Sequence, residues 1–135
     1  MVVGTFPVNP IGWVRKSALS GCMDIEILPE HQEGLYRIDL NETLLVLFIF
    51  DRSTTVDLLV HPRGDPRNPL VGVFASRSPN RPNHIGATAV RLVKREGNVL
   101  TVEGLDAWEG TPVVDIKPDR RSKALEPDPS MVKTN

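Results

Sequence analysis

Short apolar stretches separated by Gly- and Pro-rich turns recur along the chain, and they predict strands. Residues 44–50 are apolar, rich in branched and aromatic side chains, and too few for a typical helix, so we expect a strand buried on both faces. Residues 24–28 alternate polar and apolar side chains. Residues 85–93 also alternate, and Glu96-Gly97-Asn98 then reads as a hairpin turn into a strand at 99–102. Further strand candidates are 11–14, 56–60, 71–75 and 112–116.

Helical signal is confined to residues 29–34, where Pro29 and Gly34 bracket one or two turns. Six to eight short strands separated by Gly- and Pro-rich turns favour an all-β fold, which we expect to be a single compact β-barrel with one short helical turn. We expect this barrel domain to occupy residues 1–118. From Asp119 the chain is polar and proline-bearing, so residues 119–135 are expected to form a C-terminal tail, either mobile or docked on a partner.

The composition, with 40% hydrophobic and 24% charged residues among 135, is that of a globular protein. A net charge of -1 excludes a global attraction to nucleic acid or membranes, so an anionic partner needs a local basic patch. The single cysteine, Cys22, indicates a reducing compartment. The longest apolar run is too short to cross a bilayer, and the N-terminus lacks a secretory pattern, so we expect a cytoplasmic protein without membrane contact.

A local basic patch is present in residues 60–86, which hold four arginines against one carboxylate, Asp65. Five prolines in the same segment exclude helix and restrict the directions of the side chains. The planar fork of arginine suits phosphates and carboxylates, so the segment fits RNA phosphates or a small carboxylated or aromatic ligand. The alternative is a solvated loop whose arginines pair with scattered carboxylates.

Other chemistry finds little support in the sequence. His61 and His84 have no metal-ligand spacing, so we expect hydrogen-bonding roles and no metal site. Cys22 is expected to be an incidental thiol. The phosphate-binding, dinucleotide-binding and serine-hydrolase motifs are absent.

A second group of polar residues lies in the turn at 104–112, where Asp106 and Glu109 could offer carboxylates to ribose hydroxyls or to an amino group. An ordinary acidic turn is the alternative. In the strand that follows, Asp115 and Lys117 are two residues apart and should share one face.

Two motifs, GVFASRSPNRPNHIG at 72–86 and EGTPVVDIKP at 109–118, closely resemble the TsaA-like (YaeB-like) family. Supporting pieces are IGWVR at 11–15 and HPRG at 61–64, and the match runs in order from about Ile11 to Pro118. The resemblance implies a compact β-barrel, usually a homodimer, that binds S-adenosylmethionine. It further implies methylation of the N6-threonylcarbamoyl-modified adenosine of tRNA.

The resemblance also nominates site residues. Cofactor-binding positions are matched by Phe50, Asp51, Arg52, Arg77, Ala87, Asp106, Ala107, Trp108 and Glu109. Substrate or RNA contacts are expected from Arg63, Arg81 and Asn83, and Asp115 and Lys117 are weak candidates for a catalytic base.

The sequence departs from the family pattern at three places. His84 replaces a proline, Asp119 replaces a tyrosine, and the stretch between Arg15 and Asp24 lacks the family's Pro-Arg-Gln or Pro-Lys-Gln. These departures leave open a non-catalytic module that binds S-adenosylmethionine or RNA, and an unrelated small-molecule activity on the same barrel.

Overall fold

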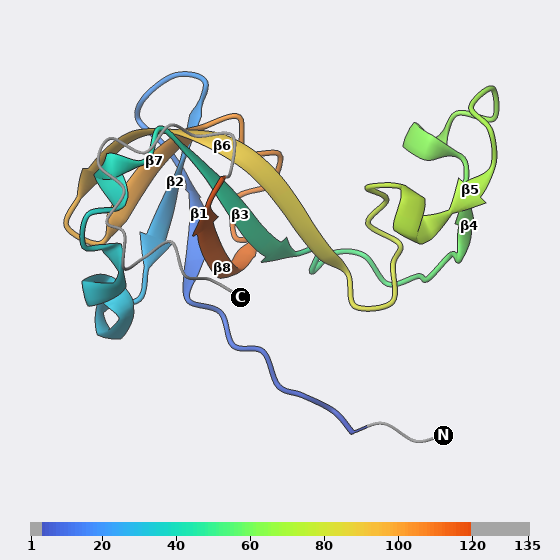
Figure 1. The fold of residues 1–135 in the computed structure, drawn as a ribbon, viewed down its shortest axis with the longest axis horizontal. Coiled ribbons are helices and arrows are strands. Elements are labelled where there is room, and N and C mark those ends of the chain that lie inside the picture. The colour runs from blue at the N-terminus through green and yellow to red at the C-terminus, as the bar shows by residue number, and fades with distance from the viewer. Residues whose placement is uncertain (1–3, 120–135) are drawn as a thin grey trace, which may run out of the picture.

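The computed structural model describes residues 4–119, whose strands close into a barrel (Figure 1). Six antiparallel strands form it in the order β1-β2-β7-β6-β3-β8. Their bounds are Gly12–Lys16 for β1, Cys22–Ile27 for β2, Thr43–Ile49 for β3, Ile85–Glu96 for β6, Val99–Glu103 for β7 and Pro112–Pro118 for β8. The predicted all-β barrel is confirmed, and its strands arise where the sequence shows short apolar or alternating stretches.

Strand β3 lies between β6 and β8. Leu44, Val46 and Phe48 are buried and point into the barrel, whereas the side chains that alternate with them are only partly buried. The prediction that residues 44–50 are buried on both faces is therefore wrong. A closed barrel of one sheet has a single interior, so alternate side chains of each strand must face outward.

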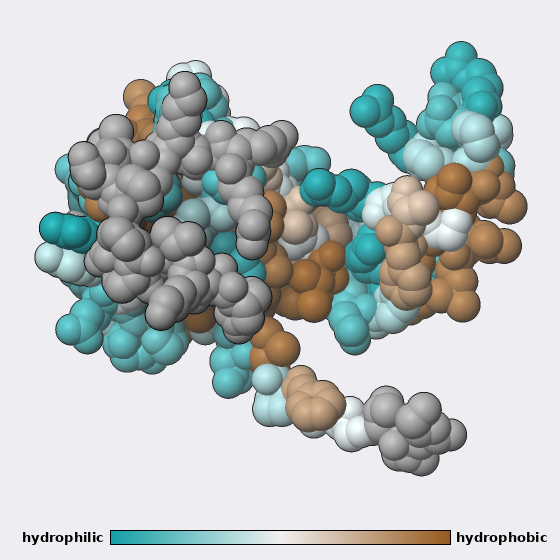
Figure 2. All heavy atoms as spheres, viewed as in Figure 1, coloured by the Kyte–Doolittle hydropathy of each residue, from teal (hydrophilic) through white to brown (hydrophobic). Residues whose placement is uncertain are grey.

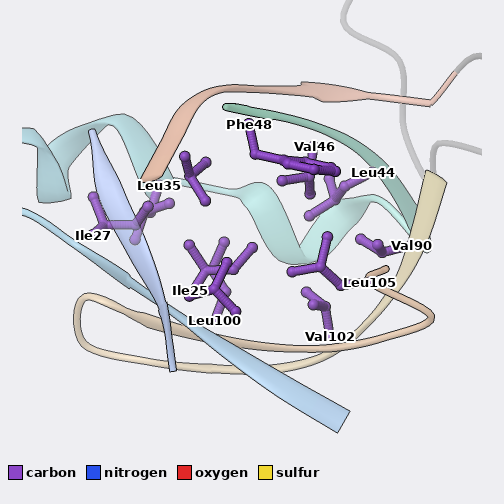
Figure 3. Close-up of a cluster of buried hydrophobic side chains, with 12 residues drawn as sticks. Ile25, Ile27, Leu35, Leu44, Val46, Phe48, Val90, Leu100, Val102 and Leu105 are labelled. Carbon is purple, nitrogen blue, oxygen red and sulfur yellow. The ribbon is translucent and has the colours of Figure 1, made fainter. Parts of the chain in front are cut away.

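Twelve buried residues form the core inside the barrel (Figure 3). Most come from the strands, among them Ile25 and Leu100, which are fully buried. The predicted helical turn is a 3₁₀ helix, η1 (Pro29–Leu35), followed by a second one, η2 (Ile38–Leu40). Leu35 at the end of η1 is 5% exposed and completes the core at this end of the barrel.

Residues 50–84, which we call the lobe, project from the barrel between the end of β3 and the start of β6 (Figure 1). The strand candidates at 56–60 and 71–75 shorten to β4 (Leu59–Val60) and β5 (Val71–Gly72), which pair with each other outside the barrel. Two 3₁₀ turns accompany them, η3 (Pro62–Gly64) and η4 (Val73–Ala75). Prolines cannot donate to a ladder, which limits the length of these strands.

The tail predicted at 119–135 lies, beyond Asp119, outside the described residues. Within residues 4–119 no helix has the length and apolar character needed to span a membrane.

Candidate cofactor site at the rim of the barrel

Two segments far apart in the sequence meet where β3 ends. Residues 50–52 follow β3, and residues 106–109 form the acidic turn between β7 and β8. The guanidinium of Arg52 lies over the indole ring of Trp108, with its Cζ 4.3 Å from the ring centroid. Arg52 Nη2 also lies 3.4 Å from the carbonyl oxygen of Glu109, to which it donates. The structure thus brings together two of the segments nominated for cofactor binding.

The acidic turn is held against β1 by backbone hydrogen bonds. Gly110 N donates to Val14 O at 2.7 Å, and Val14 N donates to Thr111 O at 2.9 Å. Gly110 has a φ of +90°, which glycine adopts without a steric cost. The Trp108 side chain lies outside the core and is 64% exposed.

The start of β6 adjoins the end of β3 through a close approach at Gly86. A Cβ built on Gly86 would lie 2.6 Å from the Phe48 ring and 2.8 Å from the Phe50 ring. The two rings pack edge to face, with centroids 5.1 Å apart. Gly86 is therefore required by this aromatic pair, which gives the glycine of the HIG sequence a structural role.

Arg77 and Ala87, both nominated for the cofactor, are in direct contact. Arg77 Nη1 donates to the carbonyl oxygen of Ala87 at 2.5 Å. Ala87 pairs with Leu47 of β3, so this contact places the arginine beside the junction of β3 and β6. The Arg77 side chain itself is exposed.

The candidate site is an open surface. Arg52, Trp108 and Glu109 are all exposed, and the two cavities found beside η1 are lined by other residues. An exposed aromatic ring, two arginines and the carboxylates of Asp106 and Glu109 can bind a ligand that combines a flat ring, hydroxyl groups and charge.

In the basic segment at 60–86, some arginines make hydrogen bonds within the segment and others do not. Arg81 is partly buried, and its Nη1 donates to Ser76 O at 3.0 Å and to Ser78 O at 3.1 Å, so it braces the loop at 76–81. Arg63 is exposed in η3, with a φ of +61°, and Asn83 is exposed near the start of β6.

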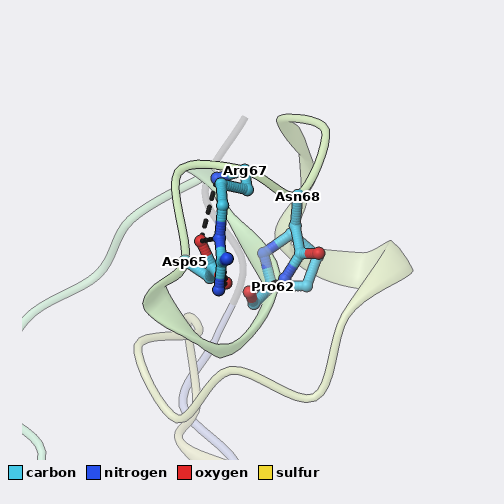
Figure 4. Close-up of polar contacts among 4 residues, drawn as sticks. All are labelled: Pro62, Asp65, Arg67 and Asn68. Carbon is cyan, nitrogen blue, oxygen red and sulfur yellow. Dashed lines mark hydrogen bonds and ion pairs between the residues drawn. The ribbon is translucent and has the colours of Figure 1, made fainter.

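Around η3 the loop is closed by its own side chains (Figure 4). Arg67 Nη2 and Nε lie 2.8 Å and 3.2 Å from Asp65 Oδ2. The hydrogen bond from Arg67 lowers the pKa of the Asp65 carboxyl, and the same bond raises the pKa of Arg67. Asn68 Nδ2 donates to Pro62 O at 2.7 Å, and His61 Nδ1 donates to Asn68 O at 2.8 Å.

Sequence reasoning missed Asn80, which joins the later part of the lobe to residues 53–57 at its beginning. Its Oδ1 accepts from Ser53 Oγ at 2.8 Å, and its Nδ2 donates to Asp57 Oδ2 at 3.1 Å. Its carbonyl oxygen accepts from Asp57 N at 2.8 Å. The only signal was its place in the turn sequence SPN, which does not reveal its partners.

The sequence matches the family described as tRNA-methyltransferase O N-terminal domain over residues 10–121. The chain belongs to this family. A probable S-adenosyl-L-methionine-binding protein of Archaeoglobus fulgidus is 53% identical over 96 residues, which cover 71% of this chain and 26% of that protein. One from Pyrococcus horikoshii is 42% identical over 116 residues, covering 83% of this chain and 81% of that protein.

A solved structure described as a crystal structure of TrmO is also similar, with a TM-score of 0.68 and 31% sequence identity. The alignment covers 86% of this chain and 58% of that one. The chain therefore spans a little over half of that TrmO chain and about a quarter of the Archaeoglobus protein. These matches confirm the resemblance seen in the two motifs.

The structure describes the backbone at two of the places where the sequence departs from the family pattern. The stretch between Arg15 and Asp24 is a tight turn between β1 and β2, in which Cys22 N donates to Leu19 O at 3.2 Å. His84 has a φ of +51°, and its Nδ1 donates to Pro79 O at 2.9 Å. Proline holds φ near −65°, so the backbone at His84 differs from one built on proline.

The weak catalytic candidates, Asp115 and Lys117, form an ion pair on β8, with Lys117 Nζ 2.9 Å from Asp115 Oδ2. No hydrogen bond or ion pair within residues 4–119 joins them to Arg52 or Glu109. In the same part of the chain, no group of three or more His, Cys, Asp or Glu side chains is arranged to hold a metal ion.

Proposed function

We propose that the protein is an S-adenosylmethionine-dependent methyltransferase that acts on the N6-threonylcarbamoyl-modified adenosine of tRNA. The observation that carries the proposal is the contact of Arg52 with Trp108 and Glu109, because it unites two segments nominated for the cofactor. Family membership supports it, as does a relative from Pseudomonas aeruginosa described as a putative S-adenosylmethionine-dependent methyltransferase.

The side chains at the rim of the barrel fit this cofactor. Trp108 offers an exposed face for stacking on adenine, and Asp106 and Glu109 offer carboxylates for ribose hydroxyls. Arg77 suits the methionine carboxylate. When bound, S-adenosylmethionine supplies a methyl group on a sulfonium centre.

Positioning is the main task left to the protein, because methyl transfer from a sulfonium is an in-line displacement. Arg52 holds Trp108 in place, and the backbone bonds of Gly110 and Thr111 hold the turn that carries both carboxylates. Asp115 is our candidate to accept the proton that the methylated nitrogen loses, with Lys117 as its ion-pair partner.

For the tRNA we propose the lobe as the contact surface. On the barrel, Arg15, Arg91, Lys94 and Lys117 each pair with a carboxylate, which neutralises their charges locally, whereas Lys16 and Arg95 have no ion pair within residues 4–119. In the described part of the lobe, Arg63 and Arg81, the two arginines expected to contact RNA, have no such ion pair. Unpaired arginines on a projecting element suit a phosphate backbone.

We also propose a homodimer, for which the apolar surface of the lobe is the support (Figure 2). Five large apolar side chains on the lobe are at least half exposed, namely Val56, Leu58, Leu59, Leu70 and Phe74, which is 78% exposed. A gathered apolar surface of this kind is typical of a protein–protein interface. A second copy bound there would also cover the open cofactor site.

Sedimentation of the wild type and of Phe74→Ser tests the proposed dimer interface. A dimer that persists unchanged in the variant would contradict an interface at the lobe.

The proposed activity is tested by calorimetric titration with S-adenosylmethionine, followed by methylation of tRNA from a strain that lacks the endogenous enzyme. The matched control is tRNA from a strain that cannot make the threonylcarbamoyl modification. We expect methyl transfer to the first tRNA and none to the second. Absence of cofactor binding at millimolar concentration would overturn the proposal.

The second candidate is a non-catalytic module that binds S-adenosylmethionine or RNA. The turn between β1 and β2 favours it, because residues 17–21 of this turn lack the family's Pro-Arg-Gln stretch. Cofactor binding without methyl transfer to either tRNA would select this candidate. For both candidates we propose a cytoplasmic location, which agrees with the single free Cys22.

A further inference from the structure

A groove of about 400 Å³ lies beside η1, away from the residues nominated for the cofactor. Its lining includes Ile11, Ile27, Ile38 and Ile116, which we call the floor, and Glu30, His31 and Glu33 of η1, which are exposed and which we call the rim. We call it the η1 groove. Its volume lies within the range of sites that hold a small molecule or a short peptide segment.

The carboxylates at the rim lack cations in the described structure. Glu30 and Glu33 are exposed and have no side-chain hydrogen bond or ion pair within residues 4–119. Asp115, which also lines the groove, is paired with Lys117. An apolar floor with unpaired carboxylates at its edge is complementary to a segment that carries both cations and aliphatic side chains.

Such a segment follows the last described residue. Asp119 N donates to Thr43 O at 3.2 Å, which places the exit of the chain just after η2, whose Ile38 lies in the floor of the groove. Residues 120–125 read RRSKAL, with three cations, no carboxylate, and Ala124 and Leu125 at the end. Six residues can span up to about 20 Å when extended, which allows the segment to turn back over η2 into the groove.

We propose that residues 120–125 of this chain dock in the η1 groove, with their cations facing Glu30 and Glu33 and with Leu125 against the isoleucine floor. The groove shares Asp115 with the proposed methyltransferase site, but docking is measured by disulfide yield and by unfolding, so its failure is distinguishable from a failure of methyl transfer.

Disulfide trapping tests the placement directly. In a Cys22→Ser background, His31→Cys is combined with Ser122→Cys, and the control combines Ala18→Cys with Ser122→Cys. His31 and Ala18 are both exposed, but Ala18 lies in the turn between β1 and β2, at the opposite end of β1 and β2 from η1. We expect an intramolecular disulfide at His31→Cys in about ten-fold higher yield than in the control, because docking raises the effective concentration.

Two results of the trapping experiment would overturn the proposal. Equal yields in the two variants would show that residue 122 has no preference for the groove. A disulfide that forms only between molecules would show that a second copy, and not the same chain, supplies the occupant.

Charge reversal gives an independent measurement. Glu33→Lys and Lys123→Glu should each lower the urea midpoint of unfolding, and the double variant should recover most of the loss, because the pair is restored in reverse. The control is Glu33→Lys with Lys133→Glu, which should show no recovery. Additive losses in the first pair, or equal recovery in the control, would overturn the proposal.

Discussion

The guanidinium of Arg52 lies over the indole of Trp108 at 4.3 Å and ties the base of the lobe to the acidic turn. Both side chains are exposed, and an exposed cation–π pair contributes only about 0.5–1 kcal/mol. Folding therefore depends little on this contact. Its main consequence is to hold an aromatic ring in a fixed orientation at the barrel rim, which matters for a ligand that stacks there.

Arg52→Ala should weaken the binding of S-adenosylmethionine about ten-fold and lower the free energy of unfolding by less than about 1 kcal/mol. Arg52→Lys should recover only part of the affinity, because an ammonium lacks the planar face and fork of guanidinium. Calorimetry and urea unfolding measure the two quantities. Arg15→Ala is the control, since Arg15 pairs with Glu26 on the barrel. Equal affinities for Arg52→Ala and wild type would contradict the assigned role.

Gly86→Ala should destabilise the protein by about 1–3 kcal/mol, the usual cost of overpacking. The new methyl group would lie 2.6 Å from the ring of Phe48, which is 2% exposed and has no free space to move into. Gly34→Ala is the matched control, because a Cβ there meets nothing within 4 Å. Urea unfolding of both variants decides the matter, and equal stability would refute the packing argument.

His84→Pro should destabilise the protein by roughly 3 kcal/mol or more. Proline cannot adopt the φ of +51° seen at His84, and it removes the N–H that donates to Arg81 O at 3.1 Å. His84→Asn should cost little, because asparagine tolerates this backbone region. Thermal unfolding of the two variants measures the difference. A proline variant as stable as the wild type would mean that the turn at 81–84 is easily remodelled.

The sequence predicted the barrel well because strand alternation and hairpin turns are local properties. β6, β7 and their turn at 96–98 follow directly from the pattern of residues. The lobe was not predictable in this way, since its pairing of 59–60 with 71–72 depends on partners distant along a proline-rich chain. Arg81 shows the same limit, because no pattern reveals that its guanidinium faces two carbonyl groups of its own loop. The family resemblance nominated Arg52 and Trp108 for the same cofactor site, but it did not predict their direct contact.

Arg67→Ala should raise the pKa of Asp65 toward its usual value near 3.9. The hydrogen bond from Arg67 lowers this pKa in the folded protein. A carboxyl with a lowered pKa stabilises the fold above its unfolded-state pKa, and this contribution is lost as the pH falls through the folded-state value. NMR titration of the Asp65 carboxyl carbon measures the shift, with Arg91→Ala as a control that should leave Asp65 unchanged. An unchanged Asp65 titration in Arg67→Ala would show that the pair does not persist in solution.

Arg63→Ala should weaken tRNA binding and reduce the slope of log affinity against log salt by about one, as expected for the loss of one phosphate contact. Arg63 is exposed in η3 and has no ion pair in the described part of the chain, so its charge is available to a phosphate. Arg81→Ala should weaken binding as well, but with a smaller change of slope and a loss of stability, because Arg81 braces the loop at 76–81. Arg91→Ala, which removes an arginine already paired with Glu103, should change neither quantity. Filter binding at several salt concentrations separates the three variants, and a common slope for all of them would remove the lobe from the RNA interface.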